Sequence, residues 1–271
     1  MNKKLATIGV VGRKDSGKTS VVVSIIEELT NEGYQVATAK HINQQAFSMD
    51  TKGKDTWRHS AAGANPVLSV SDIETAVLIR DGVQRFSLER MLRFAPDADI
   101  LVIEGFSSLT LTDVHIGRIV CVRNEEEYSE FRQRTGGEVI AYCSTQPMGK
   151  PILNIEEDRA ILVERVVRYV RRNREIREIR SRLPGLDCAK CGYTTCDEMA
   201  EAIYRGKATL ENCVTLSLRS KLKTRLTVDD NEIPLQPFVS EIIRKSLLGM
   251  VSTLKGVSVR GDEEIHIEMG S

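Results

Sequence analysis

The sequence predicts an α/β fold with a mostly parallel sheet and flanking helices for residues 1 to about 165. Two observations support this. Short apolar runs alternate with helical patterns, and the first run leads directly into a glycine-rich loop followed by a helix. Ligands of such sheets bind beyond the carboxyl ends of the strands. The polar residues that follow each apolar run are therefore the first candidates for a functional site.

Apolar runs rich in β-branched residues mark the expected strands of this domain. They are Ala6 to Val11, Tyr34 to Ala39, Val67 to Val70, Ala76 to Ile79, Ile100 to Ile103, Ile119 to Val122 and Val139 to Tyr142. After the first run, apolar residues recur at helical spacing from Val21 to Leu29. The chain therefore provides the order strand, loop, helix that a phosphate-binding loop requires.

The loop itself, from Gly12 to Thr19, matches the pattern G-x-x-x-x-G-K-T in full. Its glycines let main-chain N–H groups turn toward phosphate oxygens, Lys18 adds a mobile cation, and the Thr19 hydroxyl can bind Mg²⁺. We also expect Lys18 to act in catalysis, by neutralising charge on the γ-phosphoryl group. The predicted nucleotide-binding residues are Gly12, Arg13, Lys14, Asp15, Ser16, Gly17, Lys18, Thr19 and Ser20.

The acidic residue of the site is predicted to be Glu104, which follows the run Ile100 to Ile103. At the end of that strand it could hold Mg²⁺ together with Thr19, or orient an attacking water. The alternative is an exposed glutamate that starts a turn at Gly105. The sequence contains no Asn-Lys-x-Asp motif for reading guanine. The residues alone therefore leave GTP and ATP open.

These motifs together resemble the molybdopterin-guanine dinucleotide biosynthesis protein B (MobB) family. The resemblance covers residues 1 to about 165 and rests on four ordered motifs. They are the loop at 12–19, Lys40-His41 with Phe47 and Asp50, Gly53 to His59 with Ala62-Gly63-Ala64, and Val102 to Phe106. It implies a GTP-binding adapter, a homodimer with weak GTPase activity. The implied partner is a molybdopterin guanylyltransferase or another molybdoenzyme maturation protein.

A charged helical pattern closes this domain, and residues 166–182 are predicted to continue it as a helical linker. The helix should end before Leu183-Pro184-Gly185, because proline disfavours a helical conformation in the preceding residue. Glutamates interrupt the arginines of this linker, and the 38 basic residues of the chain balance its 38 acidic ones. We therefore expect a solvated helix, with no binding to nucleic acid.

Residues 183–215 contain four cysteines with the spacing C-x2-C-x4-C-x16-C. Three cysteines within nine residues plus a distant fourth are typical of iron–sulfur clusters, whereas zinc sites usually show two close pairs or histidines. The segment also resembles the small four-cysteine 4Fe-4S domain of electron-transfer and corrinoid proteins of anaerobes. A structural zinc ion, or free or disulfide-bonded cysteines, are the alternatives. The predicted ligands are Cys188, Cys191, Cys196 and Cys213.

The pattern of residues 216–271 predicts a small α+β unit of order ββαβ. Its strands are expected near 222–228, 233–235 and 265–269, and its helix from Phe238 to Leu254. We expect the apolar stripe of this helix to pack on the small sheet. The other two cysteines, Cys121 and Cys143, fall in apolar strands and are expected to be core side chains.

The composition, with 41% hydrophobic residues, indicates a folded chain, and no run of eighteen apolar residues predicts a membrane span. Sparse cysteines indicate a reducing compartment, so the expected location is the cytoplasm. Two functions stay open. The first is a GTP-binding adapter for molybdenum cofactor biosynthesis. The second is an electron-transfer protein in which nucleotide hydrolysis gates delivery of an electron from the cluster.

Overall fold

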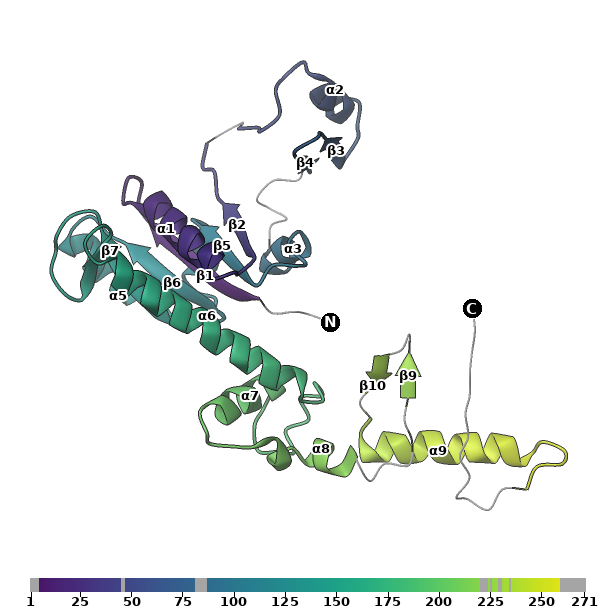
Figure 1. Cartoon of the computed structure of the whole chain (residues 1–271). Coiled ribbons are helices and arrows are strands. Elements are labelled where there is room, and N and C mark those ends of the chain that lie inside the picture. The colour runs from purple at the N-terminus through teal and green to yellow at the C-terminus, as the bar shows by residue number, and fades with distance from the viewer. Residues whose placement is uncertain are drawn as a thin grey trace. The chain divides into compact units, whose positions relative to one another are not determined.

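The computed structural model of the chain describes residues 5–44, 47–80, 87–219, 224, 226–228, 231–233 and 235–258. The chain divides into two units, Met1–Arg171 and Arg172–Ser271, and the division falls inside the long helix α6, Arg159–Ser181 (Figure 1).

A six-stranded sheet with only parallel neighbours forms the centre of the first unit, which confirms the predicted α/β fold. The strand order is β2-β5-β1-β6-β7-β8, so β1 has β5 on one side and β6 on the other. The strands are β1 Ala6–Gly12, β2 Val36–Lys40, β5 Ile100–Glu104, β6 Ile116–Cys121, β7 Val139–Ser144 and β8 Ile152–Asn154. Sequence reasoning missed β8, because its apolar run is only two residues long after Pro151.

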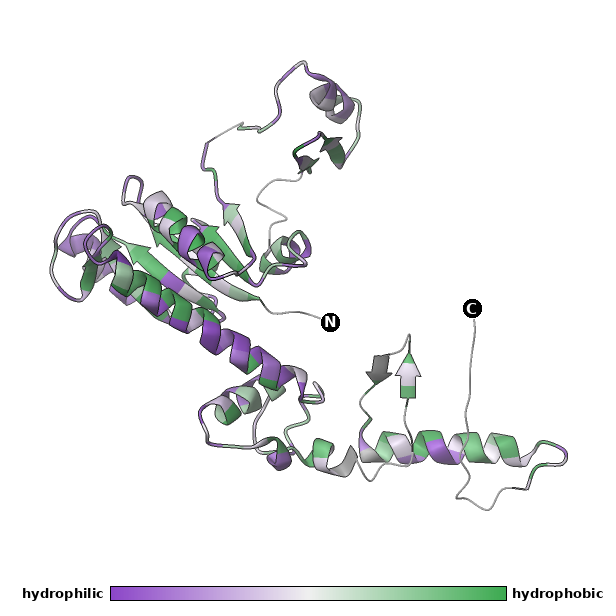
Figure 2. Cartoon of the chain, in the orientation of Figure 1, coloured by the Kyte–Doolittle hydropathy of each residue, from purple (hydrophilic) through white to green (hydrophobic). Residues whose placement is uncertain are grey.

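Helices cover both faces of this sheet. On one face, α1 (Lys18–Asn31) and α6 bury side chains such as Ile25 and Leu162 against Ile8 of β1. On the other face lie α3, α4 and α5. These three helices span Leu88–Arg93, Ser107–Thr110 and Glu125–Arg134. Figure 2 shows the central strands as hydrophobic and the later turns of α6 as hydrophilic, as expected of a solvated helix.

The strands β3 (Val67–Val70) and β4 (Thr75–Leu78) do not join the main sheet. They pair with each other as an antiparallel hairpin. The Ser71 hydroxyl closes its turn by accepting from the Glu74 N–H at 3.1 Å. The short helix α2, Asp55–Ala61, precedes them. An apolar run alone cannot distinguish a strand of the main sheet from a strand of a hairpin.

The second unit contains the cysteine-rich segment and, after it, the expected hairpin and helix. α6 ends at Ser181, as predicted from Pro184. The elements that follow are α7 Cys196–Tyr204, a 3-10 turn Leu210–Asn212, α8 Val214–Arg219, β9 Leu226–Val228, β10 Asn231–Ile233 and α9 Pro237–Ser252. The predicted final strand at 265–269, residues 222–223 and 225 of the first strand and residue 234 of the second lie outside the described residues.

Part of the apolar stripe of α9 is exposed among the described residues. Phe238, Ile242 and Met250 are 75%, 48% and 68% exposed. The hairpin of β9 and β10 has three residues in each strand, and β9 is exposed. The third strand of the predicted sheet lies outside the described residues, so packing of the stripe on that sheet stays a prediction.

Gly117→Ala is expected to destabilise the first unit by about 2 kcal/mol, the usual cost of overpacking a rigid site. A Cβ atom at Gly117 would lie 2.5 Å from Cζ of Tyr169 and 2.9 Å from Cδ1 of Ile140. The Tyr169 ring cannot move easily, because its hydroxyl accepts from Gly117 N at 2.9 Å and donates to the Thr7 carbonyl at 3.0 Å. Urea denaturation of the variant measures the change in free energy of unfolding.

The matched control is Gly136→Ala, where the nearest atom to an added Cβ is 3.9 Å away. Equal stability of the two variants would show that the Tyr169 contact does not restrict position 117.

Candidate functional site

The predicted phosphate loop joins β1 to α1 at the carboxyl edge of the sheet, and two of its glycines are required by their surroundings. Gly12 has φ 153°, and a Cβ there would lie 2.3 Å from the Cys121 carbonyl oxygen. Gly17 has φ 84°, and a Cβ there would lie 2.6 Å from Ile155 and 2.7 Å from Thr145. Only glycine fits both positions, so the loop backbone packs tightly between β6 and the segments that follow β7 and β8.

Three features of this loop fit a bound phosphate. The hydroxyl of Ser16 is buried and has no hydrogen-bond partner among the described residues. No side chain caps the N-terminus of α1, so its first N–H groups and the helix dipole are available to an anion. The Lys18 ammonium folds back over the loop and donates to the Arg13 carbonyl at 2.5 Å. A phosphate would supply acceptors for all three groups.

The structure brings the two predicted Mg²⁺ ligands together. The Thr19 hydroxyl donates to Oε1 of Glu104 at 2.9 Å. Mg²⁺ binds oxygen at about 2.0–2.1 Å in octahedral geometry, so two neighbouring ligand oxygens lie about 2.9 Å apart. Lys40 contacts both oxygens: its ammonium lies 2.9 Å from Glu104 Oε1 and 3.3 Å from Thr19 Oγ1. The oxygen pair therefore already attracts a cation.

The remaining loop residues differ in what their side chains do. The guanidinium of Arg13 pairs with Glu130 of α5 at 2.6 Å and lies 3.7 Å from Glu127. The side chains of Lys14, Asp15 and Ser20 are exposed. The Arg13 side chain is thus held by α5. The side chains of the other three residues point to solvent, so these residues would contact a phosphate through their main-chain N–H groups.

Glu127 is buried and connects the loop to the segment after β6. It accepts from Arg123 Nε at 2.8 Å and from the Arg123 main-chain N–H at 3.0 Å. The hydrogen bond from the Arg123 side chain lowers the pKa of Glu127 below its ordinary value. The carboxylate therefore stabilises the fold only while it is ionised.

Glu127→Gln is expected to reduce the free energy of unfolding by about 1–2 kcal/mol at neutral pH, because charge-assisted hydrogen bonds are lost. Since the pKa of Glu127 is depressed in the folded state, its contribution is complete above the ordinary pKa of glutamate. It is lost as the pH falls through the folded-state value. Urea denaturation of both proteins at neutral and acidic pH measures this. A difference that stays constant, or grows, toward acidic pH would contradict the assignment.

Sequence reasoning missed Arg118, which is fully buried in β6. Its Nε donates to the Thr110 carbonyl at 2.5 Å, and its Nη2 donates to the Asp113 carbonyl. The Thr110 hydroxyl in turn shares its proton between the carbonyls of Gly105 and Phe106, the two residues that follow Glu104. Arg118 therefore holds the turn that follows the acidic strand. An arginine within an otherwise apolar run was the available signal.

Lys40 ends β2, and His41, the next residue, contacts the turn that follows β5. The His41 main chain donates to the Glu104 carbonyl at 2.9 Å, and its ring stacks on Phe106 with centroids 4.8 Å apart. Farther along, Asp50 accepts from Thr56 at 2.7 Å and from Arg80 at 3.1 Å. Asp50 thus links α2 to the residues after β4, whereas Trp57 is half-buried in α2.

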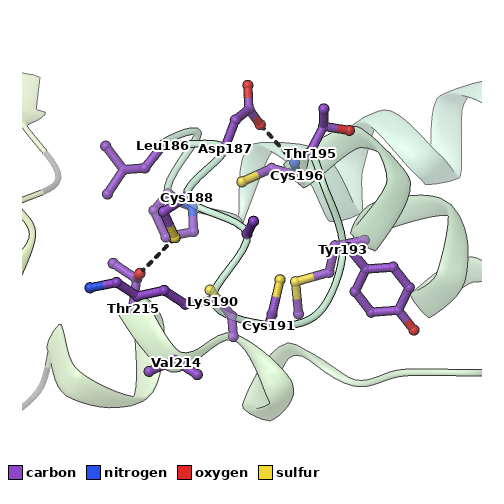
Figure 3. A pocket seen from close by; sticks show the side chains of 14 residues that line it. Leu186, Asp187, Cys188, Lys190, Cys191, Tyr193, Thr195, Cys196, Val214 and Thr215 are labelled. Atoms are coloured by element: carbon purple, nitrogen blue, oxygen red, sulfur yellow. Dashed lines mark hydrogen bonds between the residues drawn. The ribbon is translucent and has the colours of Figure 1, made fainter.

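The four cysteines of the second unit line one pocket (Figure 3). Cys196 and Cys213 are buried, and Cys188 and Cys191 are partly exposed. No group of three or more His, Cys, Asp or Glu within the described residues converges closely enough to hold a single metal ion. The ligands of a multi-iron cluster bind different iron atoms, so they surround a cavity instead of meeting at one point. Four cysteine thiols around one pocket are a donor set that a 4Fe-4S cluster can use.

The chain around the pocket is shaped by local hydrogen bonds. Asp187, with φ 44°, accepts from the Cys196 main-chain N–H at 2.7 Å, and Thr195 caps α7 by accepting from Glu198 N at 3.1 Å. The Thr215 hydroxyl lies 3.5 Å from Sγ of Cys188, and this hydrogen bond lowers the pKa of the Cys188 thiol. A lowered thiol pKa favours the thiolate, the form that binds metal.

Cys121 and Cys143, opposite each other on β6 and β7, are fully buried, as expected. Burial raises the pKa of Cys143 to about 12 and that of Cys121 well above its ordinary value. Both are therefore neutral core thiols. Within the described part of the chain, no helix has the length and apolarity needed to span a membrane.

Comparison with known proteins adds two family matches. The model of the family "Molybdopterin guanine dinucleotide synthesis protein B" matches residues 7–144. The model of the family "Putative Fe-S cluster" matches residues 183–215, the segment that holds the four cysteines.

Individual known proteins are also similar to this chain. The "Putative molybdopterin-guanine dinucleotide biosynthesis adapter protein" of Methanocaldococcus jannaschii is 29% identical over 269 residues, 98% of both chains. The "Molybdopterin-guanine dinucleotide biosynthesis adapter protein" of Haemophilus influenzae is 25% identical over 164 residues, 60% of this chain and 83% of that one. A crystal structure of molybdopterin-guanine biosynthesis protein B (mobB) is 27% identical, with a TM-score of 0.47, over 61% of this chain and 99% of that one. Because the first family model matches half of the sequence, including the phosphate loop and Glu104, the chain belongs to the molybdopterin guanine dinucleotide synthesis protein B (MobB) family.

Proposed function

We propose that this chain is a GTP-binding adapter protein of molybdopterin guanine dinucleotide biosynthesis, with weak GTPase activity and a 4Fe-4S cluster. Membership of the MobB family and the adapter role named for the relatives support the biosynthetic part. The observation that carries the nucleotide part is the phosphate loop with Thr19 and Glu104 in contact at its edge.

In this proposal the loop holds the phosphates chiefly through its main chain. The N–H groups from Gly12 to Ser20 surround the phosphate oxygens, and the buried Ser16 hydroxyl gains the partner that it lacks. Thr19 and Glu104 hold Mg²⁺, whose charge stabilises the negative charge that develops on the transferred phosphoryl group. Lys18 exchanges the Arg13 carbonyl for phosphate oxygens and adds a second positive charge.

Hydrolysis should be slow, because the described part of the site supplies little beyond these charges. Efficient GTPases use an arginine finger or a glutamine that orients water. Arg13, the arginine of the loop, is instead paired with Glu130 and lies near Glu127. Slow turnover suits an adapter whose task is to hold a nucleotide in a defined state.

We assign residues 1–165 to the nucleotide domain, 166–182 to a helical linker, 183–215 to the cluster domain and 216–271 to a separate α+β unit. The Methanocaldococcus relative covers nearly the whole of this chain, so it also spans the cysteine-rich part. A 4Fe-4S cluster would be held by the four pocket cysteines, two of which are buried. When bound, it supplies a one-electron redox centre; the protein supplies four thiolates and the hydrogen bond from Thr215.

The proposed partner is a molybdopterin guanylyltransferase, or another maturation protein of molybdoenzymes, and the proposed assembly is a homodimer. The hairpin of β3 and β4 supports association, because Leu68, Val70 and Val77 lie exposed on it. Light scattering of the purified protein gives the mass, and a mass of one chain would overturn the dimer.

The test of the adapter role is reconstitution. Guanylyltransferase, molybdopterin and GTP are incubated with and without this protein, and the transfer of GMP to molybdopterin is measured. We expect the protein to bind the transferase and to increase product formation in a GTP-dependent manner. The absence of both effects would overturn the role.

The partial exposure of Cys188 and Cys191 favours a second function, nucleotide-gated electron transfer, because an exposed cluster edge can exchange electrons. Reduction of an acceptor dye by the anaerobically reduced protein, with and without GTP, distinguishes the two. A rate that requires GTP hydrolysis would support electron transfer.

A further inference from the structure

We propose that Lys40 is a built-in substitute for Mg²⁺: its ammonium occupies the metal ligands Thr19 and Glu104, and must leave them when a metal-bound nucleotide binds. The inference rests on the proposed binding of nucleotide with Mg²⁺ and adds a specific competition between a side chain and the metal.

The register of the sheet places this lysine beside the acidic residue. β2 and β5 are parallel neighbours, and Lys40 lies directly opposite Glu104 at their carboxyl ends. Residues opposite each other in a parallel pair point to the same face of the sheet. The two side chains therefore extend from the same edge toward the first turn of α1, where Thr19 lies.

The contacts of the ammonium are those that a cation at this site would make. Lys40 Nζ lies 2.9 Å from Glu104 Oε1 and 3.3 Å from Thr19 Oγ1. The same two oxygens are 2.9 Å apart. One Glu104 oxygen thus takes part in both the Lys40 contact and the contact with Thr19.

A metal ion and this ammonium exclude each other. Mg²⁺ requires its ligand oxygens at about 2.0–2.1 Å. A metal ion bound to Glu104 Oε1 would therefore lie within a few Å of an ammonium that contacts the same oxygen, and two positive charges at that distance repel each other strongly.

Lys40 is the partner that can move. Its side chain is 54% exposed, whereas that of Glu104 is 11% exposed. The peptide group that follows Glu104 is held by two hydrogen bonds, because its N–H (Gly105) donates to the Val10 carbonyl and its carbonyl (Glu104) accepts from His41 N, each at 2.9 Å. The exchange therefore needs a rotation of the lysine side chain and no change in the strands.

This competition has a thermodynamic signature. Without Mg²⁺, Lys40 supplies positive charge near the phosphates and supports nucleotide binding. With Mg²⁺, the metal must first displace Lys40, and this displacement cancels part of the gain in nucleotide affinity that the metal brings. In a variant without Lys40, the metal has no ammonium to displace, and the nucleotide loses the lysine charge when Mg²⁺ is absent. Removing Lys40 should therefore increase the factor by which Mg²⁺ tightens nucleotide binding.

The test measures the dissociation constant of the non-hydrolysable GTP analogue guanosine 5'-(β,γ-imido)triphosphate by calorimetry, in Mg²⁺ and in EDTA. The quantity compared is the dissociation constant in EDTA divided by that in Mg²⁺. We expect this ratio to be about three- to tenfold larger in Lys40→Met than in the wild type. Lys40→Gln should behave like Lys40→Met, and Lys40→Arg, which keeps the charge, should behave like the wild type. Lys52→Met removes an exposed lysine from the segment after β2 and is the matched control.

The outcomes separate this inference from the proposed function. If the wild type binds the analogue in neither buffer, nucleotide binding itself fails and the inference fails with it. If the wild type binds but Lys40→Met leaves the ratio unchanged, Lys40 does not compete with the metal. A smaller ratio in Lys40→Met would show that Lys40 helps Glu104 to bind Mg²⁺ and would also overturn the inference.

Discussion

Lys18→Ala is expected to weaken the binding of GTP at least 100-fold. The Lys18 ammonium lies over the phosphate loop and donates to the Arg13 carbonyl, from which it can pass to phosphate oxygens. Each charge-assisted hydrogen bond to phosphate contributes about 1.5–3 kcal/mol, so losing two raises the dissociation constant by a factor of about 100 at the least. Calorimetric titration with GTP and Mg²⁺ measures the change.

The matched control is Lys14→Ala, which removes the same charge from an exposed side chain of the same loop. It should weaken binding less than about fivefold, the effect of a screened surface charge. Both variants should unfold at the same temperature as the wild type, since neither side chain is buried. Unchanged micromolar affinity in Lys18→Ala would mean that the nucleotide binds elsewhere.

The sequence allowed the main parts of this site to be predicted because they depend on local order. The loop pattern, the strand before it and the helix after it are adjacent in the chain, and backbone geometry places Gly12, Gly17 and Lys18 together. Pairing Thr19 with Glu104 required only that both lie at the carboxyl edge of one sheet. The contact of Lys40 with both depends on which strand neighbours β5, and no local pattern contains that information.

Other features escaped prediction because tertiary packing decides them. Arg13 belongs to the loop by sequence, but its side chain pairs with Glu130, a residue 117 positions away. The buried Arg118 stabilises a turn that only the folded sheet brings near. For α9, helical spacing predicts the apolar face of the helix but not which residues cover it.

In the second unit, cysteine spacing identified the residues around one pocket but not the support that they receive. Leu183, Met199 and Ala200 pack with Cys196 and Cys213 in one small core. Arg180 of α6 donates to Asp197 of α7 at 2.7 Å. Such a core is small, and domains of this size usually require a metal centre or disulfides for stability. Binding of a cluster and folding of this unit should therefore be coupled.

Cys191→Ser is expected to remove the cluster, since each cysteine of a four-thiolate site binds its own iron atom. Prepared without oxygen, the wild type should contain iron and acid-labile sulfide in equal amounts, with broad absorption in the visible range. The variant should lose most of the iron and this absorption. It should also lose protection of the Met199 and Ala200 amides from hydrogen exchange, because its small core then lacks the cluster.

Cys143→Ala provides the matched control. This cysteine is buried in β7 of the first unit, and its thiol is neutral, so removing it should leave the iron and sulfide content unchanged. The two variants together separate cysteines that bind the cluster from cysteines that fill the core. Wild-type protein with one zinc ion per chain and no iron or sulfide would overturn the cluster.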